Sequence, residues 1–172
     1  MPRGFETYHG VFDGVSLDHA NVDPNPVSVG FRMETAVPGR VIGVKFFRDL
    51  NDGNEHVGML ITDDLSEIID VVKFHKIAAS GSGPDQWHSA YFRKMHHFSG
   101  SGRFVVACFF GGGNYWSDTG LVASAPFVNG NLTITQDGDG GDNGLFTYGN
   151  LVPTSTFGSS IYGVDVIFLE DH

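Results

Sequence analysis

Residues Val27–Arg48, VSVGFRMETAVPGRVIGVKFFR, have the side-chain pattern of two β-strands. In its first half, apolar residues alternate with small or polar ones, and the apolar set is Val27, Val29, Phe31 and Met33. This period of two is typical of a β-strand with one buried face and one wet face.

A second strand follows in the same stretch. Pro38-Gly39 fits the centre of a type II turn, because proline presets the first φ and glycine accepts the positive φ that follows. After it, Ile42, Val44 and Phe46 fall on one face. Two amphipathic strands cannot bury their apolar faces alone, so we predict a hairpin covered by a second sheet.

Composition agrees with an all-β protein. The chain has 172 residues, with 24 glycines, 13% aromatic residues and only 17% charged residues. A helical protein would use more Ala, Leu, Glu and Lys. We therefore predict one all-β domain, an antiparallel β-sandwich of the jelly-roll or immunoglobulin-like kind, over residues 27–172, preceded by an extended arm over residues 1–26.

Charge and cysteine content exclude several classes of partner and an internal disulfide. The formal net charge of −10 argues against nucleic acid and anionic lipid as partners. No apolar run is long enough to span a bilayer. The single cysteine, Cys108, excludes an internal disulfide and lies in an apolar run, so we expect a buried side chain.

Further strands are expected along the chain. Residues 65–72 fit either a helix or a strand, and the β-branched residues there favour a strand. The remaining predicted strands are His56–Thr62, a strand that starts with Trp87–Phe92, Arg103–Phe110, Leu132–Thr135, Gly144–Tyr148 and Ile161–Leu169.

Several motifs resemble one known family. They are Asp23–Gly30, Val41–Phe47, Trp87–Phe92, Val105–Phe110, Gly113–Tyr115, Asn143–Gly149 and Tyr162–Phe168, in order and with compatible spacing. Together they resemble the bacterial surface-module family of unknown function numbered 4082. The resemblance implies a non-catalytic β-sandwich appended to secreted bacterial proteins, including sugar-processing enzymes. It implies binding or spacing at a surface and supplies no catalytic residues.

The start of the chain suggests where the protein is found. Met1 leads into a polar stretch with no apolar region of a signal peptide. Components of a bacteriophage particle reach the outside without a signal, so we expect a non-enzymatic virion surface protein, either a capsid decoration or a tail component. Its partners would be other copies of itself, other virion proteins and host-surface glycans. The alternative is a carbohydrate-binding or spacer module of a secreted or cell-surface bacterial protein.

Asn114-Tyr115-Trp116 is the best candidate for ligand binding. Sugar recognition commonly combines an aromatic platform with amide hydrogen bonds, and the glycines at 111–113 would let a ring approach a ligand. The alternative is that Tyr115 and Trp116 pack under the loop or into a subunit contact. Trp87 is expected in the core.

The loop at Asp137–Gly144 could hold calcium through Asp137, Asp139 and Asp142, because hard cations prefer oxygen ligands from flexible loops. It does not match the EF-hand pattern, and a solvated Gly/Asp turn is the alternative. His96 and His97 are adjacent on a predicted strand, so they cannot both bind one zinc ion. No other cofactor is expected.

An enzyme is the remaining alternative. The carboxylates of Asp63, Asp64, Glu67 and Asp70 could serve glycoside hydrolysis. They lie around a solvated turn, and no nucleophile elbow or phosphate loop occurs. We therefore predict no enzymatic activity.

The N-terminal arm carries aromatic residues that must pack against another surface to be buried. Phe5, Tyr8 and Phe12 are predicted to contact either the sandwich or a neighbouring subunit. A homo-oligomer would use them as contacts between copies.

Overall fold

Antiparallel strands make up the regular structure of this chain, for which we use a computed structural model that describes residues 7–17, 19–49, 52–78 and 86–171. No helix occurs among these residues, so none could cross a membrane. The strands are β1 (Tyr8–His9), β2 (Ala20–Val22), β3 (Val27–Thr35), β4 (Gly39–Arg48), β5 (His56–Thr62), β6 (Ile68–Lys73), β7 (Gln86–Phe98), β8 (Arg103–Phe110), β9 (Asn114–Asp118), β10 (Phe127–Asn129), β11 (Leu132–Ile134), β12 (Leu145–Tyr148), β13 (Ser155–Thr156), β14 (Ile161–Tyr162) and β15 (Val164–Glu170).

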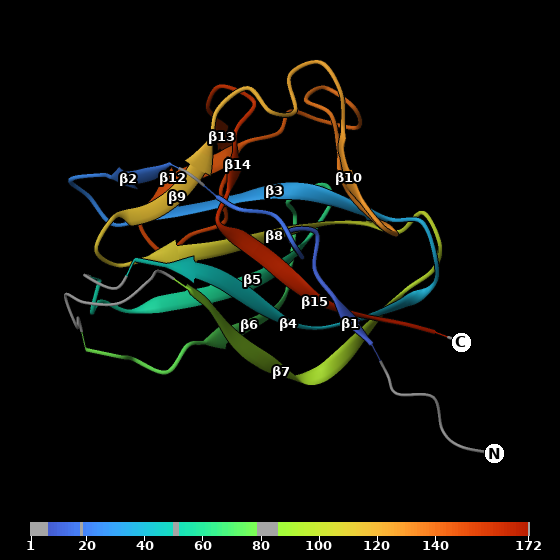
Figure 1. Cartoon of the computed structure of the whole chain (residues 1–172), viewed down its shortest axis with the longest axis horizontal. Coiled ribbons are helices and arrows are strands. Elements are labelled where there is room, and N and C mark those ends of the chain that lie inside the picture. The colour runs from blue at the N-terminus through green and yellow to red at the C-terminus, as the bar shows by residue number, and fades with distance from the viewer. Residues whose placement is uncertain (1–6, 18, 50–51, 79–85, 172) are drawn as a thin grey trace.

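Two sheets pack face to face as a sandwich (Figure 1). One has the strand order β1-β15-β4-β7. The other has the order β10-β11-β3-β8-β5-β6, with β12 also paired to β3 and β13 to β12. A small third sheet, β14-β9-β2, lies at one end. The predicted all-β sandwich is confirmed.

Aromatic side chains fill the space between the two sheets. Phe46 on β4 meets Phe110 on β8 edge-to-face, with ring centroids 5.6 Å apart. Cys108 is fully buried, and burial raises the pKa of its thiol well above the ordinary value. The largest fully buried rings are Phe12, Phe31, Phe46, Phe104, Phe110 and Phe168.

The predicted hairpin of Val27–Arg48 is wrong. β3 pairs with β8, β11 and β12, whereas β4 pairs with β15 and β7. Residues 36–38 therefore cross from one sheet to the other. Each strand turns an apolar face to the core. Because β3 and β4 lie in different sheets, these two faces oppose each other across the sandwich.

Gly39 does not serve the predicted turn. It begins β4 and does not have a positive φ. A Cβ at this position would lie 2.3 Å from Cζ of Phe168 and 2.6 Å from the carbonyl oxygen of Leu169. Glycine is needed here because β15 passes so close.

The second face of β3 is also buried, contrary to the prediction of a wet face. Ser28 is 0% exposed and Arg32 is 7% exposed. The backbone N–H of Arg32 donates to Asn143 Oδ1 over 2.9 Å, and its guanidinium lies 3.0 Å from the carboxylate of Asp63. The loop that precedes β12 covers this face and satisfies its polar groups.

The strand predictions elsewhere are confirmed within a few residues. The ambiguous segment at 65–72 overlaps the strand β6, Ile68–Lys73, and Arg103–Phe110 is β8 with the predicted bounds. The last predicted strand is divided at Gly163 into β14 and β15.

The described part of the segment 1–26 joins the sheets. β1 pairs with β15, and β2 pairs with β9. Phe12 is 1% exposed, and its ring contacts those of Phe31, Trp87 and Phe127. Phe12 therefore packs on the sandwich, which is the first of the two predicted alternatives, and its buried side chain leaves no surface for a neighbouring subunit. Tyr8 is 51% exposed, and Phe5 lies outside the described residues.

Candidate functional site

One concave site in the structure is lined mainly by aromatic side chains. Its volume is about 170 Å³. We call it the aromatic pocket and define it by Asp23, Val27, Tyr115, Phe146, Tyr148, Phe157 and Tyr162. Five of these seven residues carry aromatic rings, and one carries a carboxylate.

Four short stretches of the chain build the pocket, namely residues 23–27, Tyr115, residues 146–148 and residues 157–162. Asp23 follows β2, Val27 begins β3, and Tyr115 lies on β9. Phe146 and Tyr148 share one face of β12, because alternate residues of a strand point the same way. Phe157 follows β13, and Tyr162 ends β14. Pairing of β12 with β3 and of β14 with β9 brings these segments together.

The rings stand at steep angles to one another. Tyr115 and Tyr162 meet with centroids 5.8 Å apart and an interplanar angle of 68°. Phe146 and Tyr148 meet at 6.0 Å and 81°. Tyr162 is buried, whereas Tyr148 is 53% and Phe157 is 64% exposed. The pocket therefore has a fixed inner wall and an exposed aromatic rim.

Asp23 supplies the charge of the pocket. Tyr148 Oη donates to its Oδ2 over 3.3 Å, and the backbone N–H of Asn25 donates to its Oδ1 over 3.2 Å. The charge of Asp23 raises the pKa of Tyr148, and burial, followed by the same charge, raises the pKa of Tyr115. Both phenols keep their protons at neutral pH. The Tyr148 hydroxyl donates its one hydrogen to Asp23 and can accept a hydrogen bond from a ligand, whereas the Tyr115 hydroxyl can donate one.

The glycine loop before β9 places Asp23, not a ligand. The backbone N–H of Asp23 donates to the carbonyl of Gly113 over 2.9 Å. Gly113 has a φ of 73°, and a Cβ there would lie 2.2 Å from the carbonyl oxygen of Asp23. Only glycine permits both the positive φ and this close approach.

The three residues of the sequence-predicted ligand site do not share one site. Tyr115 lines the aromatic pocket, but Asn114 and Trp116 do not. Trp116 contacts Phe47 edge-to-face, with centroids 5.2 Å apart. Adjacent residues of a strand point to opposite faces, which separates Tyr115 from both of its neighbours on β9.

Trp116 has one unusual feature. Its indole Nε1 is buried and has no hydrogen-bond partner among the described residues. A Cβ on Gly163 would lie 3.0 Å from Cβ of Trp116 and 3.2 Å from Cβ of Phe47, so the ring is packed tightly at the join of β14 and β15. Trp87, predicted in the core, is partly buried and stacks on Phe12.

The acidic loop does not assemble its carboxylates into one cluster. Asp137 accepts from the backbone N–H of Asn143 over 2.7 Å and from Ser159 Oγ over 2.5 Å. Asp139 pairs with Arg103 at 3.2 Å. Over the described ranges, no group of three His, Cys, Asp or Glu side chains could hold a metal ion. The loop instead caps the outer face of β3, where the carbonyl of Asp142 accepts from Arg32 Nε over 3.1 Å.

The histidines and carboxylates of the other candidate sites have separate partners. His96 Nε2 lies 2.7 Å from Asp70, and His97 Nε2 lies 2.7 Å from Asp171.

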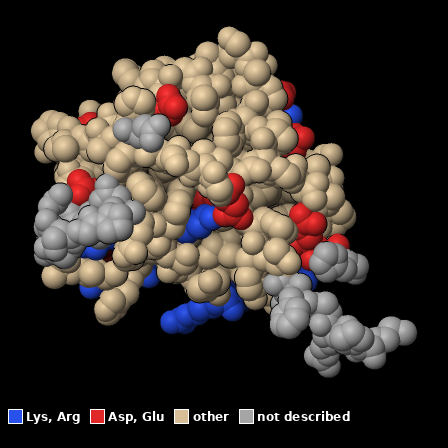
Figure 2. Space-filling model, viewed as in Figure 1, with Lys and Arg blue, Asp and Glu red and all other residues tan. Residues whose placement is uncertain are grey.

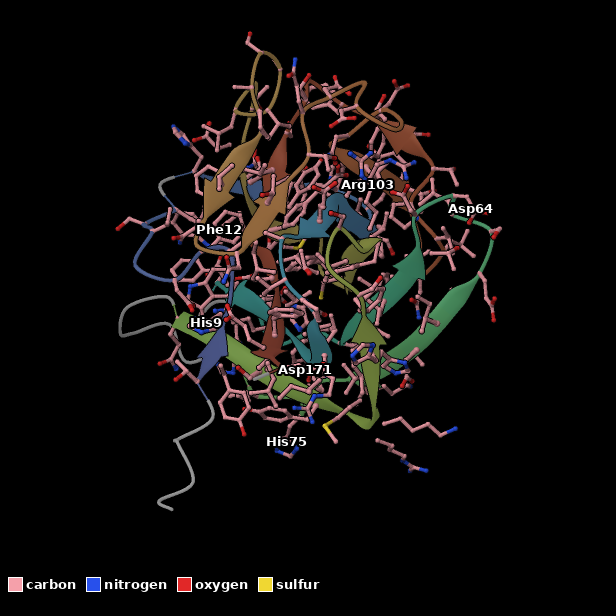
Figure 3. All side chains as sticks on the ribbon, turned by 90° about the vertical axis from the view of Figure 1, so that its right-hand side faces the viewer. His9, Phe12, Asp64, His75, Arg103 and Asp171 are labelled. Atoms are coloured by element: carbon pink, nitrogen blue, oxygen red, sulfur yellow. The ribbon has the colours of Figure 1, made fainter. Side chains whose placement is uncertain are left out.

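Hydrogen bonds from Ser66 and Thr62 lower the pKa of Asp64 to about 2. In Figure 3, Asp64 lies across the molecule from Phe12 and His9.

Surface charges form local pairs. Arg103 Nε lies 2.7 Å from Glu34, and Lys73 Nζ lies 2.9 Å from Glu55. On the face in Figure 2, acidic and basic side chains lie in small groups between uncharged atoms. Among the seven residues of the aromatic pocket, Asp23 is the one that carries a charge.

Comparison with protein families matches residues 15–164 to the family described as Domain of unknown function (DUF4082). The chain belongs to the DUF4082 family. The match covers most of the chain and includes all seven residues of the aromatic pocket. No curated protein matches the sequence.

Sequence reasoning missed most of the pocket. Tyr148 and Phe146 were inside a predicted strand, but nothing in the local pattern linked them to Asp23 or Phe157. The period-two pattern at 145–148 could have placed both rings on one face, although not against Tyr115.

Proposed function

We propose that this chain is a non-catalytic recognition module that binds glycans through the aromatic pocket, at the surface of a phage particle or of a bacterial cell. The observation that carries the proposal is an open pocket with an aromatic rim, Tyr148 and Phe157, beside one carboxylate, Asp23. A sugar ring offers C–H groups to an aromatic face and hydroxyls to a carboxylate or phenol. Sites of this kind combine apolar walls with a few placed polar groups.

The state of the other carboxylates supports binding over hydrolysis. A glycosidase needs one carboxyl whose pKa is raised so that it can act as an acid. Asp63 is paired with Arg32, and Asp70 with His96. Asp64 has its pKa lowered instead of raised, and Asp165, whose pKa burial raises, is 0% exposed and does not face the pocket. Asp23 is the carboxylate that faces the pocket, and it is hydrogen-bonded to Tyr148.

A glycan array tests this function. Wild type should bind one or more glycans, and Tyr148→Ala should weaken that binding at least about tenfold, or about 1.4 kcal/mol. Tyr91→Ala is the matched control, because Tyr91 is 59% exposed and lies outside the pocket. Loss of binding in Tyr91→Ala but not in Tyr148→Ala would place the glycan site elsewhere.

A second candidate ligand is a quaternary ammonium group, such as choline. The steep angles between the rings and the adjacent Asp23 favour it, because cations bind over aromatic faces and are stabilised by a carboxylate. Asp23→Asn separates the two ligands. It should weaken choline binding at least about tenfold. A neutral glycan should lose less, because Asn keeps hydrogen-bonding capacity.

The virion setting is tested separately from the ligand. Gene neighbours that encode capsid or tail proteins, and recovery of the chain with purified particles, would support a phage component. Recovery with the cell envelope of a bacterium in the absence of particles would support the alternative of a bacterial surface module.

A further inference from the structure

Three charged side chains meet where the N-terminal arm crosses the sheet that contains β4 and β15. Lys45 Nζ lies 2.7 Å from Asp13 Oδ1 and 3.3 Å from Asp165 Oδ2. The side chain of Asp165 is 0% exposed and that of Lys45 is 14% exposed, whereas that of Asp13 is 47% exposed. Lys45 and Asp165 are direct partners in the antiparallel register of β4 and β15. An amine and a carboxyl are thus held together away from water.

Backbone amides fix the carboxyl group of Asp165. Val11 and Val166 donate N–H to Oδ1 over 2.9 and 2.8 Å, and Phe12 donates to Oδ2 over 3.0 Å. Donors in this arrangement would also stabilise negative charge that develops on Oδ1 during attack at the carbon. Burial raises the pKa of Asp165 to about 6, so part of the population carries the neutral carboxyl near neutral pH. Burial alone would lower the pKa of Lys45, but the interactions with Asp165 and Asp13 outweigh burial and raise this pKa, so the Lys45 ammonium must give up a proton to a neighbouring group before the amine can react.

The arm closes over the pair directly. A Cβ on Gly10 would lie 2.3 Å from Asp165 Oδ2 and 2.4 Å from Lys45 Nζ. The indole of Trp87 lies on another side, with its ring centroid 5.1 Å from Lys45 Nζ. The two reacting groups are enclosed, while Asp13 connects the amine to solvent.

We propose that Lys45 and Asp165 form an intramolecular isopeptide bond between Nζ and Cγ, with Asp13 as the proton carrier. The Asp13 carboxylate takes one proton from the Lys45 ammonium and releases it to solvent. The free amine attacks Cγ of the neutral Asp165 carboxyl, so the Nζ–Cγ bond forms and the Cγ–Oδ2 bond breaks. Oδ2 leaves as water with the carboxyl proton and one amine hydrogen. No oxidant or other reactant is consumed.

Physical chemistry favours the product in this site. A buried ion pair carries a large desolvation cost, and an uncharged amide removes it. The bond would join β4 to β15, and a covalent link of this kind stabilises a fold by restricting the unfolded chain. The one cysteine, Cys108, cannot supply an internal disulfide. This inference does not depend on the proposed ligand of the aromatic pocket.

Mass spectrometry of the purified full chain tests the bond. The intact mass should be lower than the mass calculated from the sequence by one water, and a proteolytic digest should contain a branched peptide that joins Lys45 to Asp165. The digest is essential, because an Asp-Gly pair such as Asp13-Gly14 also loses water when it forms a succinimide. A folded wild-type chain of full mass, or water loss mapped to an Asp-Gly pair, would overturn the proposal.

Three variants sharpen the test. Lys45→Arg keeps the cation but removes the nucleophile, so its mass should be that of the sequence. Asp13→Asn removes the proton carrier at a half-exposed position and should lower the cross-linked fraction at least severalfold in a folded protein. Lys73→Arg is the control, because Lys73 forms an exposed pair with Glu55, and it should retain the water loss. Water loss that persists in Lys45→Arg would contradict the assignment.

Discussion

Gly113 shows how a single residue controls the aromatic pocket. Its positive φ and the absence of a side chain let the carbonyl of Asp23 pass within van der Waals range. Gly113, in the neighbouring loop, therefore fixes the position of Asp23 and of its carboxylate in the pocket.

Gly113→Ala should lower the free energy of unfolding by about 1–3 kcal/mol or more, because a left-handed backbone and a close contact are both penalised. It should also weaken ligand binding by moving Asp23. The control is Gly120→Ala, where φ is also positive, at 81°, but nothing lies within 4 Å of a Cβ. Chemical denaturation measures both variants, and an equal loss in the two would contradict the role given to the close approach.

His88 is a second informative residue. Burial, and then the charges of Arg48 and His56, lower its pKa, and its Nε2 is buried without a hydrogen-bond partner among the described residues. The unfolded chain therefore binds a proton more readily than the folded chain. The stability that neutral His88 provides is complete above the unfolded value near 6.5 and is lost as the pH falls through the lower folded pKa.

The difference in unfolding free energy between wild type and His88→Gln should consequently shrink as the pH is lowered from about 7.5 to about 5. Urea denaturation at a series of pH values measures it. If this difference in unfolding free energy stays the same at every pH in the range, His88 does not titrate differently in the folded and unfolded states.

At the scale of elements, the strands could be predicted from the sequence but their partners could not. Val27, Val29, Phe31 and Met33 alternate, and this pattern correctly identifies a strand with an apolar face. The same pattern says nothing about which strand lies beside it. Pro38-Gly39 fits a hairpin turn in sequence, whereas in the structure the glycine at 39 lets β15 approach.

The alternation rule could have corrected the candidate site. Asn114, Tyr115 and Trp116 were grouped because they are adjacent, but β9 turns Tyr115 away from both neighbours. Predicting the rest of the pocket requires the pairing of β12 with β3, which depends on packing of the whole chain.

The N-terminal arm is an element of the core. Phe12→Ala should lower the free energy of unfolding by about 3–5 kcal/mol, because it removes a fully buried ring from contacts with three others. Tyr8→Ala is the control on the same arm and should change stability by about 0.5 kcal/mol or less, because Tyr8 is half exposed. Denaturation of both variants measures the effect, and similar losses would mean that the arm is not anchored through Phe12.

For the molecule as a whole, self-association remains a prediction, and it concerns the surface around Tyr8. Tyr8 lines a concave surface together with Ile42, Tyr91, Met95 and Leu169. Tyr8→Asp should reduce the molar mass in sedimentation equilibrium if copies associate there. A wild-type chain that remains monomeric at high concentration would contradict the predicted homo-oligomer.

We propose the aromatic pocket as the recognition site of the molecule. The most direct measurement is an aromatic ¹H–¹³C NMR titration of the full chain with the strongest glycan from the array. The account predicts shifts of the ring signals of Tyr115, Tyr148 and Phe157, with those of Tyr91 and Trp116 unchanged. Shifts at Trp116 or Tyr91 while the pocket rings remain unperturbed would contradict it.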